Sequence, residues 1–466
     1  MSGPAGPPLP SLRPGAALLE RLRRHQRTTF LVASGVSTAG SFAGLTAKGW
    51  ILMHGTGNPL VLALHFAVLA LPSLLVSGRA GVLTDRLGCE TMLIRAQWGL
   101  FVAGALGALA IPLQTGGMQV ALLMLSTLLA GVASAFELTA RNKYCALVVD
   151  SPAQLAPYIT SFSVVFNVGK LVGPPLGGWL VAATGPLAAL SIDAATYLLP
   201  IATVIWLLRP NRALEQRSGP GRTATLATAW RDCGRPLRHV LGFTAIACLV
   251  GFFHPGLAPL MAAEILGPSP QDLGVFTSVL AAGSICGGVV LQRNSRWLSA
   301  RPALLLGTSV LITGVAQVGM GASRSKLVAL AMAWLIGAGT ASLLAGVNLI
   351  SQVGSPMVLR GRMAGLGQIA FLGGGGLSGL IAAALSLQIG LPATFMWLGG
   401  LGVALGLWEL TRRAGLRIPE AAASAEGTGR PGSDQAHAAQ HHGREEGSSQ
   451  TAAHQTEIDR RAHGRL

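Results

Sequence analysis

Twelve long apolar stretches constrain this chain more than any other feature of its sequence. Each runs for about 20 residues or slightly more with very few charged residues, at residues 29–53, 60–83, 91–112, 118–138, 157–182, 186–208, 239–264, 272–291, 302–322, 326–350, 363–388 and 391–411. A helix needs roughly 20 apolar residues to cross a hydrocarbon core about 30 Å thick. Lipid cannot satisfy free backbone N–H and C=O groups, so each stretch must be helical. The sequence therefore predicts an all-α polytopic membrane protein with twelve transmembrane helices.

Composition and missing motifs exclude several other classes of protein. Charged residues make up 11% of the 466 residues, against about 25% in a soluble domain. The basic residues that give the net charge of +16 lie beside apolar stretches, so we expect no nucleic-acid partner. The five cysteines are scattered without a CxxC pair, which predicts reduced thiols, no metal and no cofactor. No Walker-type loop, Ser-His-Asp arrangement or metalloprotease spacing is present, so we expect neither an enzyme nor ATP-driven transport within this chain.

Basic residues indicate how the helices are oriented. With the N-terminus taken as cytoplasmic, seven arginines between residues 209 and 238 fall on the same side as Arg21, Arg23, Arg24, Arg27, Arg86, Arg95, Arg141, Lys143, Arg293, Arg296, Arg301, Arg360, Arg362, Arg412, Arg413 and Arg417. The opposite side carries only Arg324 and Lys326. Because positive charge accumulates on the cytoplasmic side, both termini are predicted to be cytoplasmic. The membrane is expected to be the plasma membrane, which is the cell inner membrane in a Gram-negative organism.

The apolar stretches divide the chain into five parts. A cytoplasmic N-terminal segment (1–28), with a basic amphipathic stretch expected along the inner leaflet, precedes a six-helix bundle at 29–208. An Arg-, Pro- and Gly-rich cytoplasmic loop (209–238) leads to a second six-helix bundle at 239–411. The tail at 412–466 lacks apolar residues to bury and is predicted to be disordered and solvated, despite five histidines at irregular spacing.

A weak internal repeat relates the two bundles. Gly81-Val-Leu-Thr-Asp-Arg86 follows the second stretch, and Gly288-Val-Val-Leu-Gln-Arg293 follows the eighth, at an offset of 207 residues from Gly81 to Gly288. The glycine-rich run beginning at Gly173 recurs loosely at Gly375, an offset of 202 residues. Two offsets near 200 indicate a duplicated six-helix unit, which is common in transporters. The predicted architecture is two pseudo-symmetric six-helix bundles.

Two local motifs suggest moving parts. In the first, formed by Gly81, Asp85, Arg86 and Gly88, the carboxylate can accept hydrogen bonds from an arginine such as Arg141 and so latch the bundles together on the cytoplasmic side. An ordinary charged turn is the alternative interpretation. The second motif lies in the fifth stretch, where small residues favour close packing and proline favours a bend that shapes a pathway; its members are Gly169, Gly173, Pro174, Gly177 and Gly178.

These motifs resemble those of the major facilitator superfamily. Residues 81–88 are similar to its loop motif and residues 169–178 to its fifth-helix motif, which the superfamily associates with exporters working as antiporters. Arg360-Gly361-Arg362 and the pattern Phe166-Asn167-x-x-Lys170 resemble the enterobactin-exporter branch. The resemblance covers residues 28–411. Cys89-Glu90 replaces the usual basic pair, which implies a weaker latch. The fourth stretch lacks the arginine of many proton-driven members, which argues against proton coupling through that site.

The resemblance implies a secondary active transporter that works by alternating access. The expected reaction is proton-driven export of a small amphipathic or anionic molecule, siderophore-like or drug-like, by a monomer in the lipid bilayer. An importer or facilitator of the same fold is the alternative within transport. A non-transporting membrane sensor or scaffold is the alternative from another class.

Ionisable residues inside the apolar stretches are candidate functional residues, because an unpaired charge in lipid is costly. Lys170 lies about 18 Å from the outer end of its stretch at 1.5 Å per residue and shares a helix face with Ser163 and Asn167. This polar face suits an anionic solute, although a lysine paired with a fixed carboxylate is the alternative.

Other polar residues in the stretches have two interpretations each. Lys48 and Asp193 have similar predicted depths, which favours a structural ion pair first and proton coupling by Asp193 second. His254 beside Pro255 can titrate near neutral pH or simply pack between helices. Asn348 and Gln368 can contact solute or form hydrogen bonds between helices.

Overall fold

The computed structural model describes residues 14–113, 116–149, 152–207, 230–231, 233–353 and 360–412. Every regular element in these ranges is a helix. The first half of the chain forms α1 (Pro14–Thr56), α2 (Pro59–Leu87), α3 (Cys89–Leu109), α4 (Gly117–Val148), α5 (Pro152–Thr196) and α6 (Leu198–Ala202), with a 3-10 turn at Ile111–Leu113 and a π-helical turn at Thr203–Leu207. The second half forms α9 (Arg235–Gly251), α10 (His254–Ile265), α11 (Pro270–Arg293), α12 (Ser295–Ser299), α13 (Pro302–Ala322), α14 (Lys326–Val353), α15 (Arg360–Ile389) and α16 (Leu391–Thr411).

Where the structure describes the residues of the twelve predicted stretches, nearly all of them are helical. Ten helical segments among the described residues are long and apolar enough to cross a membrane. One of them, Asn167–Trp206, contains part of the fifth and most of the sixth predicted stretch, because two helices meet at Gly185 within α5. The stretch at 60–83 lies on α2. The stretch at 239–264 is divided between α9 and α10.

Two glycine turns support the predicted duplication. Gly185 has φ +82° and Gly390 has φ +81°, a backbone region that is costly for residues with a Cβ. Each residue introduces the last long helix of its half of the chain. Their offset of 205 residues, from Gly185 to Gly390, lies between the two offsets seen in the sequence repeat.

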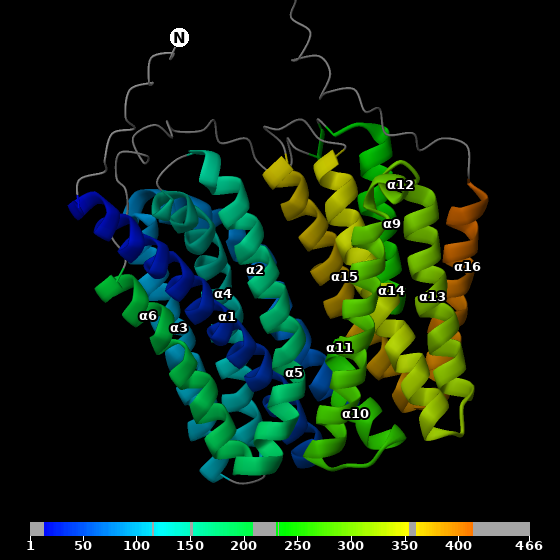
Figure 1. Cartoon of the computed structure of the whole chain (residues 1–466). Coiled ribbons are helices and arrows are strands. Elements are labelled where there is room, and N and C mark those ends of the chain that lie inside the picture. Colours follow the sequence, from blue (N-terminus) through cyan, green and yellow to red (C-terminus); the bar gives the residue numbers. More distant parts are fainter. Residues whose placement is uncertain are drawn as a thin grey trace, which may run out of the picture. The chain divides into compact units, whose positions relative to one another are not determined.

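Helix pairing within the two halves follows one pattern. In the first half α1 packs on α5, and α4 packs on α2 and α3. In the second half α9 packs on α15, and α14 packs on α11 and α13. Contacts between the halves are made chiefly by α2 with α15 and by α5 with α11, which are equivalent pairs under the same repeat. Figure 1 shows the first six helices on one side and the later helices on the other. The predicted pair of pseudo-symmetric helical bundles is confirmed.

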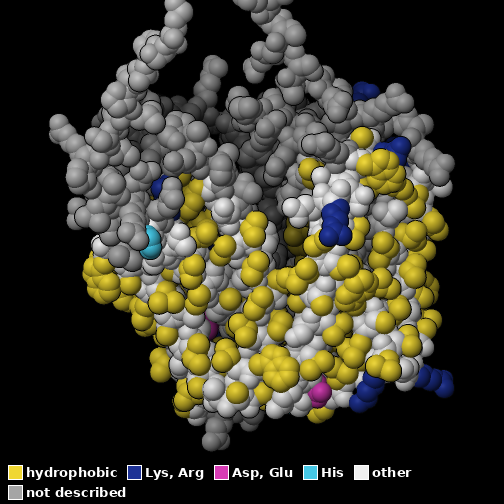
Figure 2. Space-filling model, in the orientation of Figure 1, with side chains coloured by type: hydrophobic (Ala, Val, Ile, Leu, Met, Phe, Trp, Pro, Cys, Tyr) yellow, Lys and Arg dark blue, Asp and Glu magenta, His cyan; other side chains and the backbone are white. Residues whose placement is uncertain are grey.

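The exterior of the helices is apolar, as expected for a surface that faces lipid. Hydrophobic side chains cover much of the described part of the face drawn in Figure 2, and Lys and Arg lie toward its upper and lower ends. Leu75, Val164, Trp206, Ile285 and Leu401 are among the exposed large hydrophobic residues. A soluble domain of this size could not keep such a surface in water.

Candidate functional site

The glycines of the fifth-stretch motif form a close-packed face between α5 and α1. A Cβ at Gly169 would lie 2.9 Å from the Gly35 carbonyl oxygen, and one at Gly173 would lie 2.6 Å from the Ala39 carbonyl oxygen. Gly177 is equally close to the α1 backbone. The helix continues through Pro174, and Gly185 is the residue of α5 with non-helical backbone angles. These glycines therefore pack closely on α1, and α5 is interrupted at Gly185, while the predicted pathway-shaping bend at Pro174 stays a prediction.

Gly178 faces the other half of the molecule. A Cβ there would lie 2.5 Å from the Gly274 nitrogen and 2.9 Å from the Pro270 carbonyl oxygen, both on α11. The equivalent contact between α15 and α2 places Gly379 against Ala63 at 3.7 Å, measured from the Cβ that glycine lacks. Small residues thus bring the backbones of the two bundles close together at both cross-bundle helix pairs.

This contact lies on the side of the membrane that the basic residues predict to be outside. The Trp50 Nε1 group donates a hydrogen bond across it to the Pro268 carbonyl, at 3.4 Å. A buried apolar cluster is continuous from α1 and α2 into the second bundle and includes Leu62, Phe253 and Phe276. The two bundles are therefore packed against each other at the predicted outer side.

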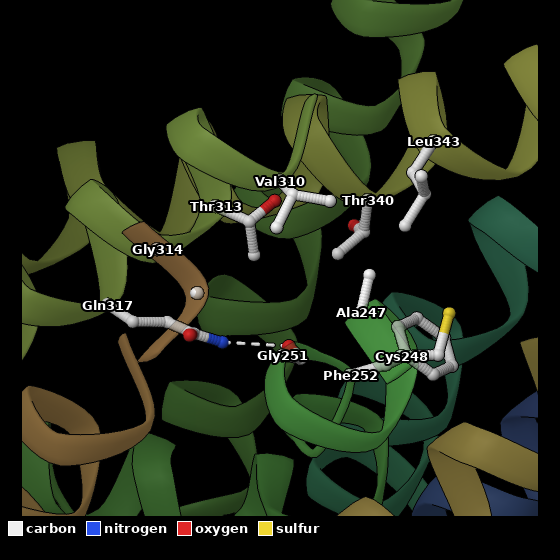
Figure 3. Close-up of a pocket in the computed structure, with 11 residues that line it drawn as sticks. Ala247, Cys248, Gly251, Phe252, Val310, Thr313, Gly314, Gln317, Thr340 and Leu343 are labelled. Atoms are coloured by element: carbon white, nitrogen blue, oxygen red, sulfur yellow. Dashed lines mark hydrogen bonds between the residues drawn. The ribbon is translucent and has the colours of Figure 1, made fainter. Parts of the chain in front are cut away.

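An interrupted helix lies beside this contact. Pro255 lies four residues after Gly251. Because proline has no N–H, it cannot donate the helical hydrogen bond to the Gly251 carbonyl. The Gln317 Nε2 group from α13 donates to that carbonyl instead, at 2.7 Å. Figure 3 shows this bond at the edge of a small cavity that is lined in part by Phe252, Thr313 and Thr340. The sequence analysis did not single out Gln317, although its position inside an apolar stretch marks it as unusual.

His254 begins α10 at the same interruption. Its side chain is buried, its ring centroid lies 4.9 Å from that of Phe252, and its Nδ1 atom has no hydrogen-bond partner among the described residues. Phe252 also contacts Phe371 of α15 in a tilted arrangement, with 4.2 Å between ring centroids. Phe252 thus lies between His254 and α15 at the junction of α9, α10 and α15.

The structure gives less detail on the four other residues that were predicted to contact solute. Asn348 is half-buried on α14, and its Oδ1 atom lies 3.8 Å from the Cβ position of Gly367 on α15. Asn167 is exposed on α5. The backbones of Lys170 and Gln368 lie in α5 and α15, and their side chains lie outside the described residues.

A buried polar network links the helices of the first bundle around Lys48. The Lys48 ammonium group donates to Ser126 Oγ at 2.7 Å, and Ser126 in turn donates to the Ala103 carbonyl at 2.7 Å. His65 contacts Thr127 Oγ1 through Nδ1 at 3.0 Å and the Leu45 carbonyl through Nε2 at 3.4 Å. Lys48, His65 and Ser126 are all buried.

Asp193 lies in the same network without a direct bond to Lys48. Its carboxylate packs against Gly44 of α1, where a Cβ would collide with it. Tyr197, one turn further along, donates to Ser41 Oγ at 2.9 Å. Among the described residues, the ion pairs do not include one between Lys48 and Asp193. The two charges predicted to pair are thus in the same buried cluster, but the ammonium group is bound to a hydroxyl.

The loop motif lies where α2 ends. Gly81, Asp85 and Arg86 are in the last turns of the helix, and Gly88 ends it with φ +83°. The side chain of Asp85 lies outside the described residues, so the predicted latch remains a prediction. Arg141 forms an ion pair with Glu137 at 2.9 Å within α4 and lies over the Phe162 ring, 4.9 Å from its centroid.

A further buried carboxylate was not predicted from the sequence. Glu409 of α16 is fully buried and accepts a hydrogen bond from His239 Nε2 of α9 at 2.9 Å. Arg412 approaches the other ring nitrogen at 3.5 Å. A charged residue two positions inside the end of an apolar stretch was the available signal, but its partner on a distant helix was not visible from the sequence.

Together the fold, the apolar exterior and the cross-bundle contacts define a multi-pass membrane protein built from two helical bundles. The family model described as transmembrane secretion effector matches residues 17–426, and the chain belongs to this family. The predicted superfamily membership is thereby confirmed.

Curated relatives and solved structures agree with this assignment. The chain is 26% identical over 382 residues to the multidrug efflux pump Tap of Mycolicibacterium fortuitum, covering 78% of this chain and 91% of that protein. It is 23% identical over 400 residues to Tap of Mycobacterium tuberculosis, covering 81% and 91%. The crystal structure of the peptide transporter POT with sulfate has a TM-score of 0.64 at 13% identity, covering 84% of this chain and 96% of that one. That structure supports the fold alone. The family and these relatives identify the chain as a transporter rather than an enzyme.

Proposed function

We propose that this protein is a proton-driven exporter of a small amphipathic or anionic molecule, siderophore-like or drug-like, that works by alternating access. The observation that carries the proposal is the contact between the bundles. The pairs α2–α15 and α5–α11 are equivalent under the repeat, and glycines lie in both contacts. Smooth, small-residue contacts can separate and re-form as two rigid bundles rock. The naming of relatives as multidrug efflux pumps supports export.

The proposal includes a topology and a resting conformation. Both termini and the 209–238 loop are placed in the cytoplasm, in a plasma membrane, with one chain as the functional unit. On that orientation, the packed side described here faces outward and the substrate enters from the cytoplasmic side. Asp85 and Arg141 are assigned to the inner latch.

Lys170 is assigned to solute recognition. Its backbone position on α5 lies about 22 Å from Gly185 at 1.5 Å per residue, which is deep in the membrane. Replacing Lys170 by alanine is expected to raise the apparent Km for anionic solutes more than for neutral ones, and Lys170→Arg should retain part of the activity. Equal losses for both kinds of solute at normal protein abundance would leave a structural lysine.

Transport in proteoliposomes tests the proposal. The purified chain would be reconstituted with an imposed pH gradient and offered the anionic dye 8-anilinonaphthalene-1-sulfonate and the cationic dye ethidium in parallel. We expect gradient-dependent dye movement that a protonophore abolishes. Movement that equilibrates without responding to the gradient would indicate a facilitator. No movement across a wider set of anionic, neutral and cationic compounds would favour a sensor or scaffold.

A further inference from the structure

Five helices of the first bundle enclose a buried acid and a buried base, both described, that form no ion pair with each other. Lys48 of α1 is 5% exposed, and Asp193 of α5 is 4% exposed. The polar groups around them are His65 of α2, Ser126 and Thr127 of α4, and Tyr197, which follows α5. Helix α3 contributes the Ala103 carbonyl and the backbone near Gly107. Glu137, the other acid buried on α4, is already bonded to Arg141.

The base is held away from the acid. An ammonium group prefers a carboxylate to a neutral hydroxyl, because a hydrogen bond between two charged groups is the stronger one. Yet Lys48 donates to Ser126 Oγ at 2.7 Å, and Ser126 directs its own hydrogen to Ala103. This geometry is the one expected when no carboxylate charge is available to Lys48.

The acid has the environment of a neutral carboxyl group. Asp193 Oδ1 is buried and has no hydrogen-bond partner among the described residues. An ionised carboxylate with such an oxygen would bear a desolvation penalty of several kcal/mol. A protonated group buries no charge. His65 is less suited to hold the proton in exchange, since both of its ring nitrogens already contact α1 or α4.

We propose that Asp193 carries the coupling proton and that Lys48 moves from Ser126 to Asp193 when the proton leaves. The inference rests on the proton-driven export proposed above. On release, the O–H bond of the carboxyl group breaks and the proton passes to water. The carboxylate then pairs with the Lys48 ammonium, which keeps its three hydrogens, and rebinding of a proton returns Lys48 to Ser126. Because α1 and α5 carry the two groups, this exchange changes the contact along which those helices pack.

Reconstituted full-length protein distinguishes proton coupling from dye binding. The two assays are exchange of ethidium or 8-anilinonaphthalene-1-sulfonate at equal pH and accumulation of the same dye against an imposed pH gradient. Asp193→Asn should keep exchange and lose gradient-driven accumulation, whereas Glu264→Gln, an exposed carboxylate on α10, should keep both. Asp193→Asn that still accumulates dye in response to the gradient would overturn the proposal.

Two further measurements keep the proposal testable if Asp193→Asn does not fold or if neither dye is exported. Ser126→Ala removes the partner of Lys48 in the state with Asp193 protonated, so the pH of half-maximal gradient-driven transport should decrease. An unchanged pH profile would contradict the exchange.

Infrared difference spectra of the wild-type chain during a pH titration should contain a carboxyl C=O band that is missing in Asp193→Asn. The band can be present when dye export fails, so the proton site and the export function are tested separately. Its absence in the wild-type chain would overturn the site.

Discussion

At the scale of single residues, Pro255 decides where the seventh span is interrupted. It removes the donor for the Gly251 carbonyl, and Gln317 supplies one from a neighbouring helix. A carbonyl inside the membrane without a donor is unfavourable, so the interruption depends on this side chain. The residue that holds the interruption is therefore not in the interrupted helix itself.

Gln317→Leu is expected to destabilise the protein by about 1–3 kcal/mol, because it leaves the Gly251 carbonyl unsatisfied. Thermal unfolding in detergent, followed by intrinsic fluorescence, would measure the loss. Pro255→Ala restores a backbone donor, so the loss should be much smaller when Gln317→Leu is made in that background. Equal losses in both backgrounds would show that Gln317 acts elsewhere, and Gln292→Leu on the exposed end of α11 provides the matched control.

Glu409 and His239 should behave as a coupled pair. His239→Ala leaves a fully buried carboxylate without its imidazole partner, with an expected cost of about 3–5 kcal/mol. His239→Ala combined with Glu409→Gln should recover much of that loss in the same unfolding assay. Strictly additive losses would mean that the two residues stabilise the fold independently.

At the scale of helices, α5 uses its glycines on two different faces. Gly169, Gly173 and Gly177 bring it against α1 within one bundle, whereas Gly178 brings it against α11 of the other. Adjacent glycines at 177 and 178 therefore serve internal packing and the contact between bundles, respectively. A larger side chain at either position should have distinguishable effects.

Gly178→Val should prevent close approach at the predicted outer side without unfolding the first bundle. The added methyl groups would collide with the α11 backbone at Gly274. We expect faster labelling of a cysteine placed at Ser278 by a membrane-impermeant maleimide. Gly288→Val, at an α11 glycine with no neighbour within 4 Å of its Cβ position, should leave the labelling rate unchanged. Equal rates in the two variants would argue against Gly178 as a contact residue.

The helices were predictable from the sequence, whereas the partners of polar residues were not. Apolar length determines which segments can cross a membrane, so the long helices could be located from the sequence. Lys48 and Asp193 could be assigned similar depths from their positions, but depth does not show which hydrogen bond the ammonium group makes. Ser126 has no distinguishing signal in sequence, because serine is common in membrane helices. Such partners follow from how helices rotate against one another.

At the scale of the whole chain, the repeat explains how the two bundles meet. Equivalent helices make the internal pairs of each bundle, and exchanging the halves maps the α2–α15 contact onto the α11–α5 contact. A contact made of such equivalent pairs can open on one side while it closes on the other. The structure has the predicted outer side packed, and the reciprocal arrangement is expected to pack the inner side.

Distances between paired spin labels test alternating access most directly. One pair, at Met118 and Leu327, would report the predicted outer side, where these residues are 65% and 79% exposed. The other pair, at the exposed Arg86 and Arg293, would report the predicted inner side. Pulsed electron paramagnetic resonance in nanodiscs should show the outer distance lengthening as the inner distance shortens when the pH is changed or a transported dye is added. Alternating access would be contradicted if each label pair kept one unchanged distance under all these conditions. It would also be contradicted if the outer and inner distances lengthened together.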